Sequence, residues 1–190
     1  GTLTLSNQAT NSQLLQYMPP LGATCTVVES TPLPPTPAYH EWTGAPSYSL
    51  DGGTPTAQLN NLLIDNTGHS VMVTNNLLRQ TSTLNVTKLI TPSEVAAVGD
   101  FGFTVSCQTP AGSYAGTVAV TAGNTGTTSI SVPAGSTNCQ VNETSRATPP
   151  QGYQWTDAVY QQPSADPLQA GATVNASITN TPRAANVALN

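Results

Sequence analysis

Charge of both signs is scarce in this sequence. Of its 190 residues only 7% are charged, the formal net charge is −5, and Lys and Arg together number four. Binding to nucleic acid, or to an anionic membrane surface, requires clustered basic residues. The composition therefore excludes an electrostatic nucleic-acid footprint and argues against binding to an anionic membrane surface.

Long apolar runs are also missing. A transmembrane helix needs about 18 consecutive apolar residues, and no stretch approaches that length, so we predict no membrane insertion of this segment. No signal peptide, phosphate-binding loop or dinucleotide fingerprint is recognisable, and no cofactor is predicted. The sequence begins in a strand-like run at residues 1–5, which is typical of a mature or excised segment.

Cysteine and histidine are too few for most site chemistries. His40 and His69 lack metal-ligand spacing to each other or to a cysteine, and no nucleophile elbow accompanies them. We therefore expect neither a metal site nor a turnover enzyme. The cysteines, Cys25, Cys107 and Cys139, are odd in number. In an exported protein one thiol would then have its partner outside the chain, whereas a cytosolic protein would keep all three reduced.

The abundant residues indicate an all-β fold. Thr, Ser, Val, Ala, Gly and Asn dominate in alternating runs, with 16 prolines and 15 glycines mostly between them. No segment shows a sustained helical period. The same composition, poor in Lys and Glu, favours export. The clearest predicted strands are residues 25–29, 70–75, 84–90, 101–107, 114–121, 127–132 and 173–180, with another at residues 153–155 and a short linker at residues 78–82.

One pattern occurs twice. The spacing Cys-x-x-x-Glu lies in a Thr/Val-rich alternating run at residues 25–29 and again at residues 139–143, and each time a proline-rich turn and a Tyr/Trp pair follow. The alignment continues from Val73-Thr74-Asn75 to Ile178-Thr179-Asn180. The sequence therefore predicts tandem small Ig-like or prealbumin-like β-sandwiches of about 100 residues each.

The alignment also predicts the domain organisation. Residues 81–182 form a complete β-sandwich repeat, residues 1–80 a partial repeat that lacks its first strands, and residues 183–190 a linker or the start of a following repeat. The positions matching Lys88 and Cys107 in the first copy would lie upstream of Gly1. We expect the missing strands to come from upstream sequence or from a neighbouring subunit.

The candidate reactive residues are Lys88, Glu143 and Asn180. Lys88 is the single lysine and shares strand parity with Val86 and Ile90, so it is expected to face the apolar interior. Burial lowers the pKa of a lysine and makes its amine a nucleophile, while a protonated carboxyl group polarises an amide carbonyl. A buried Lys–Glu–Asn cluster can thus form an amide cross-link and release ammonia. Alternatively, Lys88 extends to solvent at a strand edge and Glu143 is a surface charge.

These motifs together resemble a known family. The Lys, Glu and Asn motifs resemble those of the collagen-adhesin B-type, prealbumin-like domain of Gram-positive stalks and pili. With the cysteines included, the pattern resembles a repeat family of actinobacterial surface proteins. The resemblance covers residues 82–182 fully and 1–76 partly. The motifs that carry it are Val86-Thr87-Lys88, Glu143 after a Cys-x-Val strand, Pro150-x-Gly152-Tyr153 and Ile178-Thr179-Asn180-Thr181.

The resemblance implies a specific covalent bond. In that family the matching Lys and Asn form an intramolecular isopeptide bond that the Glu catalyses, which implies a Lys88–Asn180 bond with Glu143 as catalyst. In the first copy only Glu29 and Asn75 match, so no such bond can close within it.

Two further pairs of residues have open alternatives. Cys107 and Cys139 lie in strands expected to be neighbours, where a disulfide would contribute roughly 3–4 kcal/mol; otherwise both are buried thiols. Cys25 is predicted to be unpaired or bonded to an external segment. Tyr153 and Trp155 form either a binding platform or, more commonly, part of the core.

The sequence predicts a structural role outside the cell. The preferred function is an extracellular stalk or fibre segment, pilus- or adhesin-like, on a cell surface and anchored to the wall through regions outside this chain. Its partners would be neighbouring repeats or subunits of the same protein, and a host or surface ligand. The alternatives are a ligand-binding adhesin module, or a filament subunit completed by strands from a neighbouring subunit.

Overall fold

The structure is a computed structural model that describes residues 13–14, 18–93, 97–121 and 125–185. These residues form strands and turns, so the all-β prediction is confirmed, and none of them forms a helix that could span a bilayer. By its contacts the chain divides into unit 1, residues 1–78, and unit 2, residues 79–190. The predicted strand at residues 1–5 and the last residues, 186–190, lie outside the described residues.

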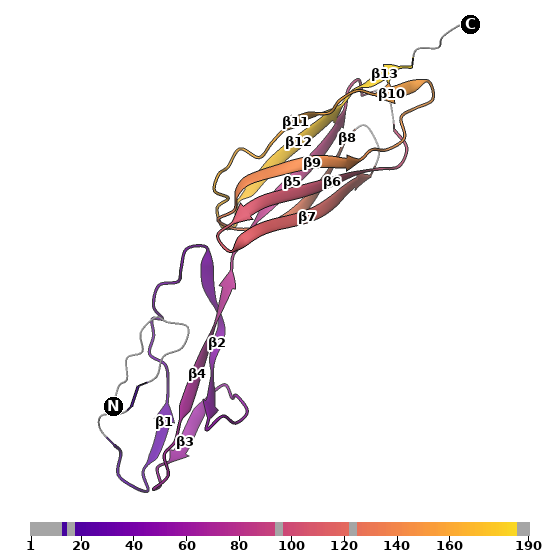
Figure 1. The fold of residues 1–190 in the computed structure, drawn as a ribbon. Coiled ribbons are helices and arrows are strands. Elements are labelled where there is room, and N and C mark those ends of the chain that lie inside the picture. The colour runs from indigo at the N-terminus through magenta and orange to yellow at the C-terminus, as the bar shows by residue number, and fades with distance from the viewer. Residues whose placement is uncertain (1–12, 15–17, 94–96, 122–124, 186–190) are drawn as a thin grey trace, which may run out of the picture. The chain divides into compact units, whose positions relative to one another are not determined.

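Unit 2 is a β-sandwich of two main sheets (Figure 1). One sheet has the strand order β11-β12-β5-β8, the other has the order β7-β6-β9, and β10 pairs with β13 in a separate two-stranded sheet. The strands are β5 (Thr81–Ile90), β6 (Asp100–Thr109), β7 (Gly112–Thr121), β8 (Thr125–Pro133), β9 (Thr137–Ser145), β10 (Tyr153–Trp155), β11 (Val159–Gln161), β12 (Thr173–Asn180) and β13 (Pro182–Ala184).

The core of unit 2 lies between these two sheets. Alternate residues of each strand point inward, so the sequence alternation of β5 and β12 becomes an alternation of exposed and buried side chains. Burying a large apolar side chain stabilises a fold by about 1.5–3 kcal/mol. The buried cluster includes Leu84, Val86, Phe101, Phe103, Val105, Val141, Leu168 and Ile178.

The central pair of the larger sheet is parallel. β5 and β12 pair in register from Thr83 opposite Thr173 to Ile90 opposite Asn180, whereas the other pairings of unit 2 are antiparallel. A parallel pair needs a long crossover between its strands, and here the whole opposing sheet lies in that crossover. The first and last long strands of the unit are therefore direct neighbours.

The described residues of unit 1 form two two-stranded sheets, β1-β3, which is antiparallel, and β2-β4. Its strands are β1 (Thr24–Val27), β2 (His40–Leu50), β3 (Leu59–Leu63) and β4 (Val71–Arg79), whose last residue belongs to unit 2. Among the described residues of unit 1, only Tyr48 and Ser49 are buried. The described part of unit 1 therefore contributes very little core.

Several strand limits differ from the sequence prediction. The predicted linker at residues 78–82 is wrong: β4 runs to Arg79 and β5 starts at Thr81, because no Gly or Pro interrupts the alternation there. β1 ends at Val27, two residues before the predicted end. The alternation gave no signal for β11 and β13, which are three residues each; β13 begins in the predicted repeat and extends into the predicted linker.

Candidate cross-link site

Lys88 faces the interior of unit 2, as its strand parity predicts. Its side chain is 2% exposed, and the neighbouring inward positions of β5, Val86 and Ile90, are also buried. The Nζ atom donates hydrogen bonds to the backbone oxygens of Leu89 at 3.1 Å and Ile178 at 3.4 Å, and lies 4.6 Å from the centre of the Phe101 ring. The alternative of an edge lysine extending to solvent is therefore wrong.

Asn180 shares this interior face because of the parallel register. Lys88 lies opposite Ile178, and Asn180 is two residues further along β12, so its side chain points to the same side of the sheet. Asn180 is fully buried, and its Nδ2 donates to both carboxylate oxygens of Glu143, at 2.9 Å and 3.1 Å.

Glu143 completes the cluster from the opposing sheet. It lies on β9, its side chain is 1% exposed, and its Oε1 is 3.7 Å from the Nζ of Lys88. One carboxylate thus contacts both the amine of Lys88 and the amide nitrogen of Asn180. The alternative of Glu143 as a surface charge is wrong.

The electrostatics of the cluster make the amine of Lys88 easier to deprotonate than an ordinary lysine. Burial lowers the pKa of Lys88 from 10.5 to about 8, although the negative charge and hydrogen bonding of Glu143 oppose the shift. The positive charge of Arg146 lowers it further. Arg146 donates from Nε to Glu143 Oε2 at 2.7 Å and from a terminal nitrogen to the backbone oxygen of Thr156 at 3.0 Å.

Sequence reasoning missed three contributors to this site. Arg146 could have been found from its spacing, since a basic residue three positions after Glu143 can bond back to it. Phe101 lies under the amine, and the hydroxyl of Tyr160 accepts a hydrogen bond from the Glu143 backbone N–H at 3.3 Å. These two contacts join distant parts of the chain, and no local pattern signals them.

The carbonyl oxygen of Asn180 has no hydrogen-bond partner, although it is buried. An unsatisfied buried oxygen costs about 1–3 kcal/mol, so its position calls for an explanation. A half-turn of the carboxamide would direct this oxygen at the Glu143 carboxyl group, which could then donate to it once protonated. A protonated Glu143 could therefore polarise the side-chain carbonyl group of Asn180 while the neutral amine of Lys88 lies beside the same carboxyl group.

Unit 1 contains two of the matching residues without a lysine. Asn75 on β4 donates from Nδ2 to Glu29 Oε1 at 2.6 Å, and the Glu29 backbone N–H donates to the hydroxyl of Tyr48 at 3.1 Å. The other carboxylate oxygen, Oε2, is buried without a hydrogen-bond partner.

The cysteines of unit 2 are joined. Cys107 on β6 and Cys139 on β9 form a disulfide, as predicted. Between Ser106 and Gln108 the β6–β9 register shifts, so one residue of β6 faces two of β9, and Asn138 takes a positive φ of 50°. This bulge aligns Cys107 with Cys139. Cys25 of unit 1 is a free, half-buried thiol.

The remaining candidates from the sequence do not join the cluster. Trp155 packs edge-on against Phe101 at 5.7 Å and donates to the backbone oxygen of Ala147, so it belongs to the core, while Tyr153 is 41% exposed. His69 contacts two carboxylates, Asp51 at 2.8 Å and Asp65 at 3.3 Å, on the surface of unit 1. The described residues contain no group of three or more side chains that could hold a metal ion.

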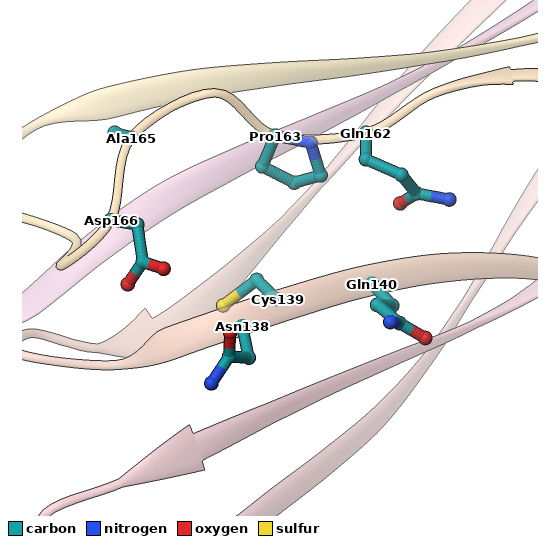
Figure 2. A pocket seen from close by; sticks show the side chains of 7 residues that line it. All are labelled: Asn138, Cys139, Gln140, Gln162, Pro163, Ala165 and Asp166. Carbon is teal, nitrogen blue, oxygen red and sulfur yellow. The ribbon is translucent and has the colours of Figure 1, made fainter.

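A pocket beside the disulfide is also separate from the cluster. Figure 2 shows it between β9 and the segment that follows β11, lined by Asn138, Cys139, Gln140, Gln162, Pro163, Ala165 and Asp166. Its polar groups are amides and one carboxylate. Gln162 also stabilises the edge of β9, because its side chain accepts from the Val141 backbone N–H at 2.7 Å and donates to the Val141 oxygen at 3.0 Å.

Comparison with known proteins gives one match. No curated protein and no solved structure matches the chain. Residues 84–183, which are 100 of the 190 residues, match the model of a family described as Domain of unknown function (DUF5979). This stretch contains Lys88, Glu143, Asn180 and both cysteines of the disulfide. The chain therefore belongs to the DUF5979 family.

Proposed function

We propose that unit 2 is a self-cross-linking module of an extracellular stalk or fibre, similar in role to the collagen-adhesin B-type domains of pili and adhesins. The observation that carries the proposal is the buried Glu143 carboxylate, which contacts both Lys88 Nζ and Asn180 Nδ2. Such an arrangement costs stability, because three polar side chains leave water together. A chemical role for the three side chains would explain why the fold tolerates this cost.

The proposed reaction balances without any cofactor. Glu143 takes a proton from Lys88, and the neutral amine attacks the side-chain carbonyl carbon of Asn180. The Nζ–Cγ bond forms and the Cγ–Nδ2 bond breaks. The departing nitrogen takes the proton held by Glu143 and the second proton released by Nζ, and it leaves as ammonium, so the neutral mass of the chain falls by one ammonia. The lowered pKa of Lys88 makes the first transfer easier. Each chain reacts once, so the module is not a turnover enzyme.

The position of the bond suits a mechanical role. Force entering unit 2 through β5 and leaving through β12 would pass directly from Lys88 to Asn180, and residues 89–179 would carry none of it. Without the bond, the same force would act on the hydrogen bonds between two parallel strands. The disulfide lies within the protected segment and holds the opposing sheet together.

Single-molecule pulling tests this role. With the bond present, residues 89–179 should not extend at any force that leaves covalent bonds intact. In a Lys88→Met variant with the disulfide reduced, the same 91 residues should extend by roughly 300 Å, at about 3.3–3.6 Å per residue. If the unchanged chain extends as far as the variant, the proposed stalk function is wrong.

The repeated arrangement supports a tandem organisation. The indole nitrogens of Trp42 and Trp155 each donate to a backbone oxygen eight residues earlier, of Pro34 and Ala147. The Glu–Asn pair and the tyrosine hydroxyl at the glutamate backbone N–H also occur in both units. We infer that unit 1 is a partial copy of the module in unit 2, and that the parent protein is a string of such modules on a cell surface.

A further inference from the structure

Unit 1 contains the acceptor half of the cross-link site. Asn75 and Glu29 make the same amide–carboxylate contact as Asn180 and Glu143, at 2.6 Å. The lysine that would complete it is not in unit 1, since Lys88 is the single lysine of the sequence and is buried in unit 2.

The charge at this half-site is uncompensated in the described part of the chain. In unit 2 the Glu143 carboxylate has two cations beside it, Lys88 and Arg146. In unit 1 the residue at the position matching Arg146 is Pro32, and Glu29 Oε2 is buried without a partner. A buried carboxylate oxygen of this kind favours a cationic or hydrogen-bond-donating group.

The backbone beside Asn75 is also open. In unit 2 the Asn180 strand, β12, pairs on one edge with β11 and on the other with the lysine strand, β5. In the described residues of unit 1 the Asn75 strand, β4, pairs only with β2. A strand edge of this kind presents unpaired N–H and C=O groups that can accept another strand.

The inward face of β4 is correspondingly under-packed. Val71, Val73 and Asn75 are half-buried, whereas the inward residues of β12 are 8% exposed or less. Eight of the twelve large apolar side chains that are exposed in the described residues belong to unit 1, among them Leu63, Met72 and Leu77. A further strand with apolar alternate residues would cover part of this surface.

We propose that unit 1 captures a lysine-bearing β-strand from outside residues 1–190 and bonds to it covalently. The occupant is an extended segment with the chemistry of β5: apolar residues at alternate positions and one lysine in line with them. It pairs in parallel with the edge of β4 that no other described strand occupies, with its lysine opposite Val73, as Lys88 lies opposite Ile178.

The covalent step follows the chemistry proposed for unit 2, on which this inference rests. The incoming amine attacks the side-chain carbonyl carbon of Asn75, the new N–C bond replaces the Cγ–Nδ2 bond, and ammonia leaves. Glu29 transfers the proton from the amine to the departing nitrogen. The product is an isopeptide bond between Asn75 and the lysine of the captured strand.

The test uses a synthetic peptide with the sequence of residues 81–91 as the probe, incubated with the full chain. The expected product is one adduct, with the mass of chain plus peptide minus one ammonia, and fragmentation should place the bond on Asn75. Asn75→Ala and Glu29→Gln chains should give at least a tenfold lower yield. The matched controls are Asn180→Ala and Glu143→Gln chains, which should form the adduct normally, and a peptide in which methionine replaces the lysine, which should not react.

Each outcome decides the inference separately from the proposed function of unit 2. Loss of ammonia from the chain alone, with no peptide adduct, would overturn the capture proposal and leave the unit 2 bond standing. An adduct on Asn180 would overturn it as well. A third outcome is that the chain alone forms covalent dimers that the Lys88→Met variant does not form. That result would assign the lysine to Lys88 of a second copy and would also overturn the capture proposal.

Discussion

Lys88 and Glu143 form a buried ion pair across the two sheets of unit 2, with Nζ 3.7 Å from Oε1 and both side chains at most 2% exposed. The separation is longer than a good hydrogen bond, and the same carboxylate is held more closely by Asn180 and Arg146. Burying two charges in loose contact costs stability. The proposed proton transfer between the two side chains would account for a pair that does not stabilise the fold.

Replacing Glu143 by glutamine should stop the cross-link while keeping the size of the side chain. Without a carboxylate no group of the cluster can carry the proton from Lys88 to the leaving nitrogen, and a general acid–base residue accounts for about 10²–10⁴ in rate. Electrospray mass spectrometry of the purified variant should show no loss of ammonia. Glu29→Gln, the equivalent change in unit 1, serves as the control and should leave the loss intact.

The free amine should make stability depend on pH. In an Asn180→Ala variant Lys88 cannot react, and its pKa is about 8 in the folded state against 10.5 for an ordinary lysine. Between these values the unfolded chain holds a proton that the folded chain has lost, so the free energy of unfolding should rise with pH in this window, by roughly 3 kcal/mol. Below about pH 8 the amine is charged in both states and the penalty is complete.

Urea unfolding at pH 7 to 11 measures this effect. The double variant Lys88→Met/Asn180→Ala provides the reference, because every other titrating group is common to both proteins. A difference between the two curves that does not change from pH 8 to 10.5 would contradict the lowered pKa.

The disulfide should stabilise unit 2 independently of the cross-link. Cys107 and Cys139 are 32 residues apart, and closing a loop of that length contributes about 3–4 kcal/mol in the chain-entropy model. In the Asn180→Ala background, a Cys139→Ala change should lower the free energy of unfolding by this amount. Cys25→Ala is the matched control: its thiol is free, so stability of unit 2 should not change.

Arg146 should act through Glu143 rather than on the reacting atoms. It bonds to Oε2, and its charge lowers the pKa of Lys88. An Arg146→Gln variant should therefore still cross-link, but the pH at which the rate of ammonia loss is half-maximal should move upward. Refolding the denatured variant at a series of pH values and following its mass with time measures the shift. An unchanged pH profile would remove Arg146 from this role.

The sequence predicted the long strands of unit 2 and the interior position of Lys88 because both depend on a period of two. β12 has the predicted limits, Thr173–Asn180, and the parity of Lys88 with Val86 placed its side chain in the core. Contacts across the sandwich have no such period. Arg146 was missed because it directly follows the last residue of β9, where the alternation ends. Phe101 was missed because its position under the amine depends on how the two sheets stack.

The strand order could not be predicted from local sequence either, because it also depends on contacts between distant segments. Nothing in β5 or β12 alone indicates that they pair in parallel, because the register is set by a crossover of more than eighty residues, from Ile90 to Thr173. Yet this pairing is what places Lys88 and Asn180 on one face. The motif order suggested that the three residues meet, and the topology supplies the physical reason.

The intact mass of the purified chain, measured under denaturing conditions, tests the central claim most directly. A Lys88–Asn180 bond predicts a mass lower than the sequence mass by one ammonia and the two hydrogens of the disulfide, with the ammonia restored in Lys88→Met after allowing for the substitution. A native mass lower by the disulfide hydrogens alone would contradict the account.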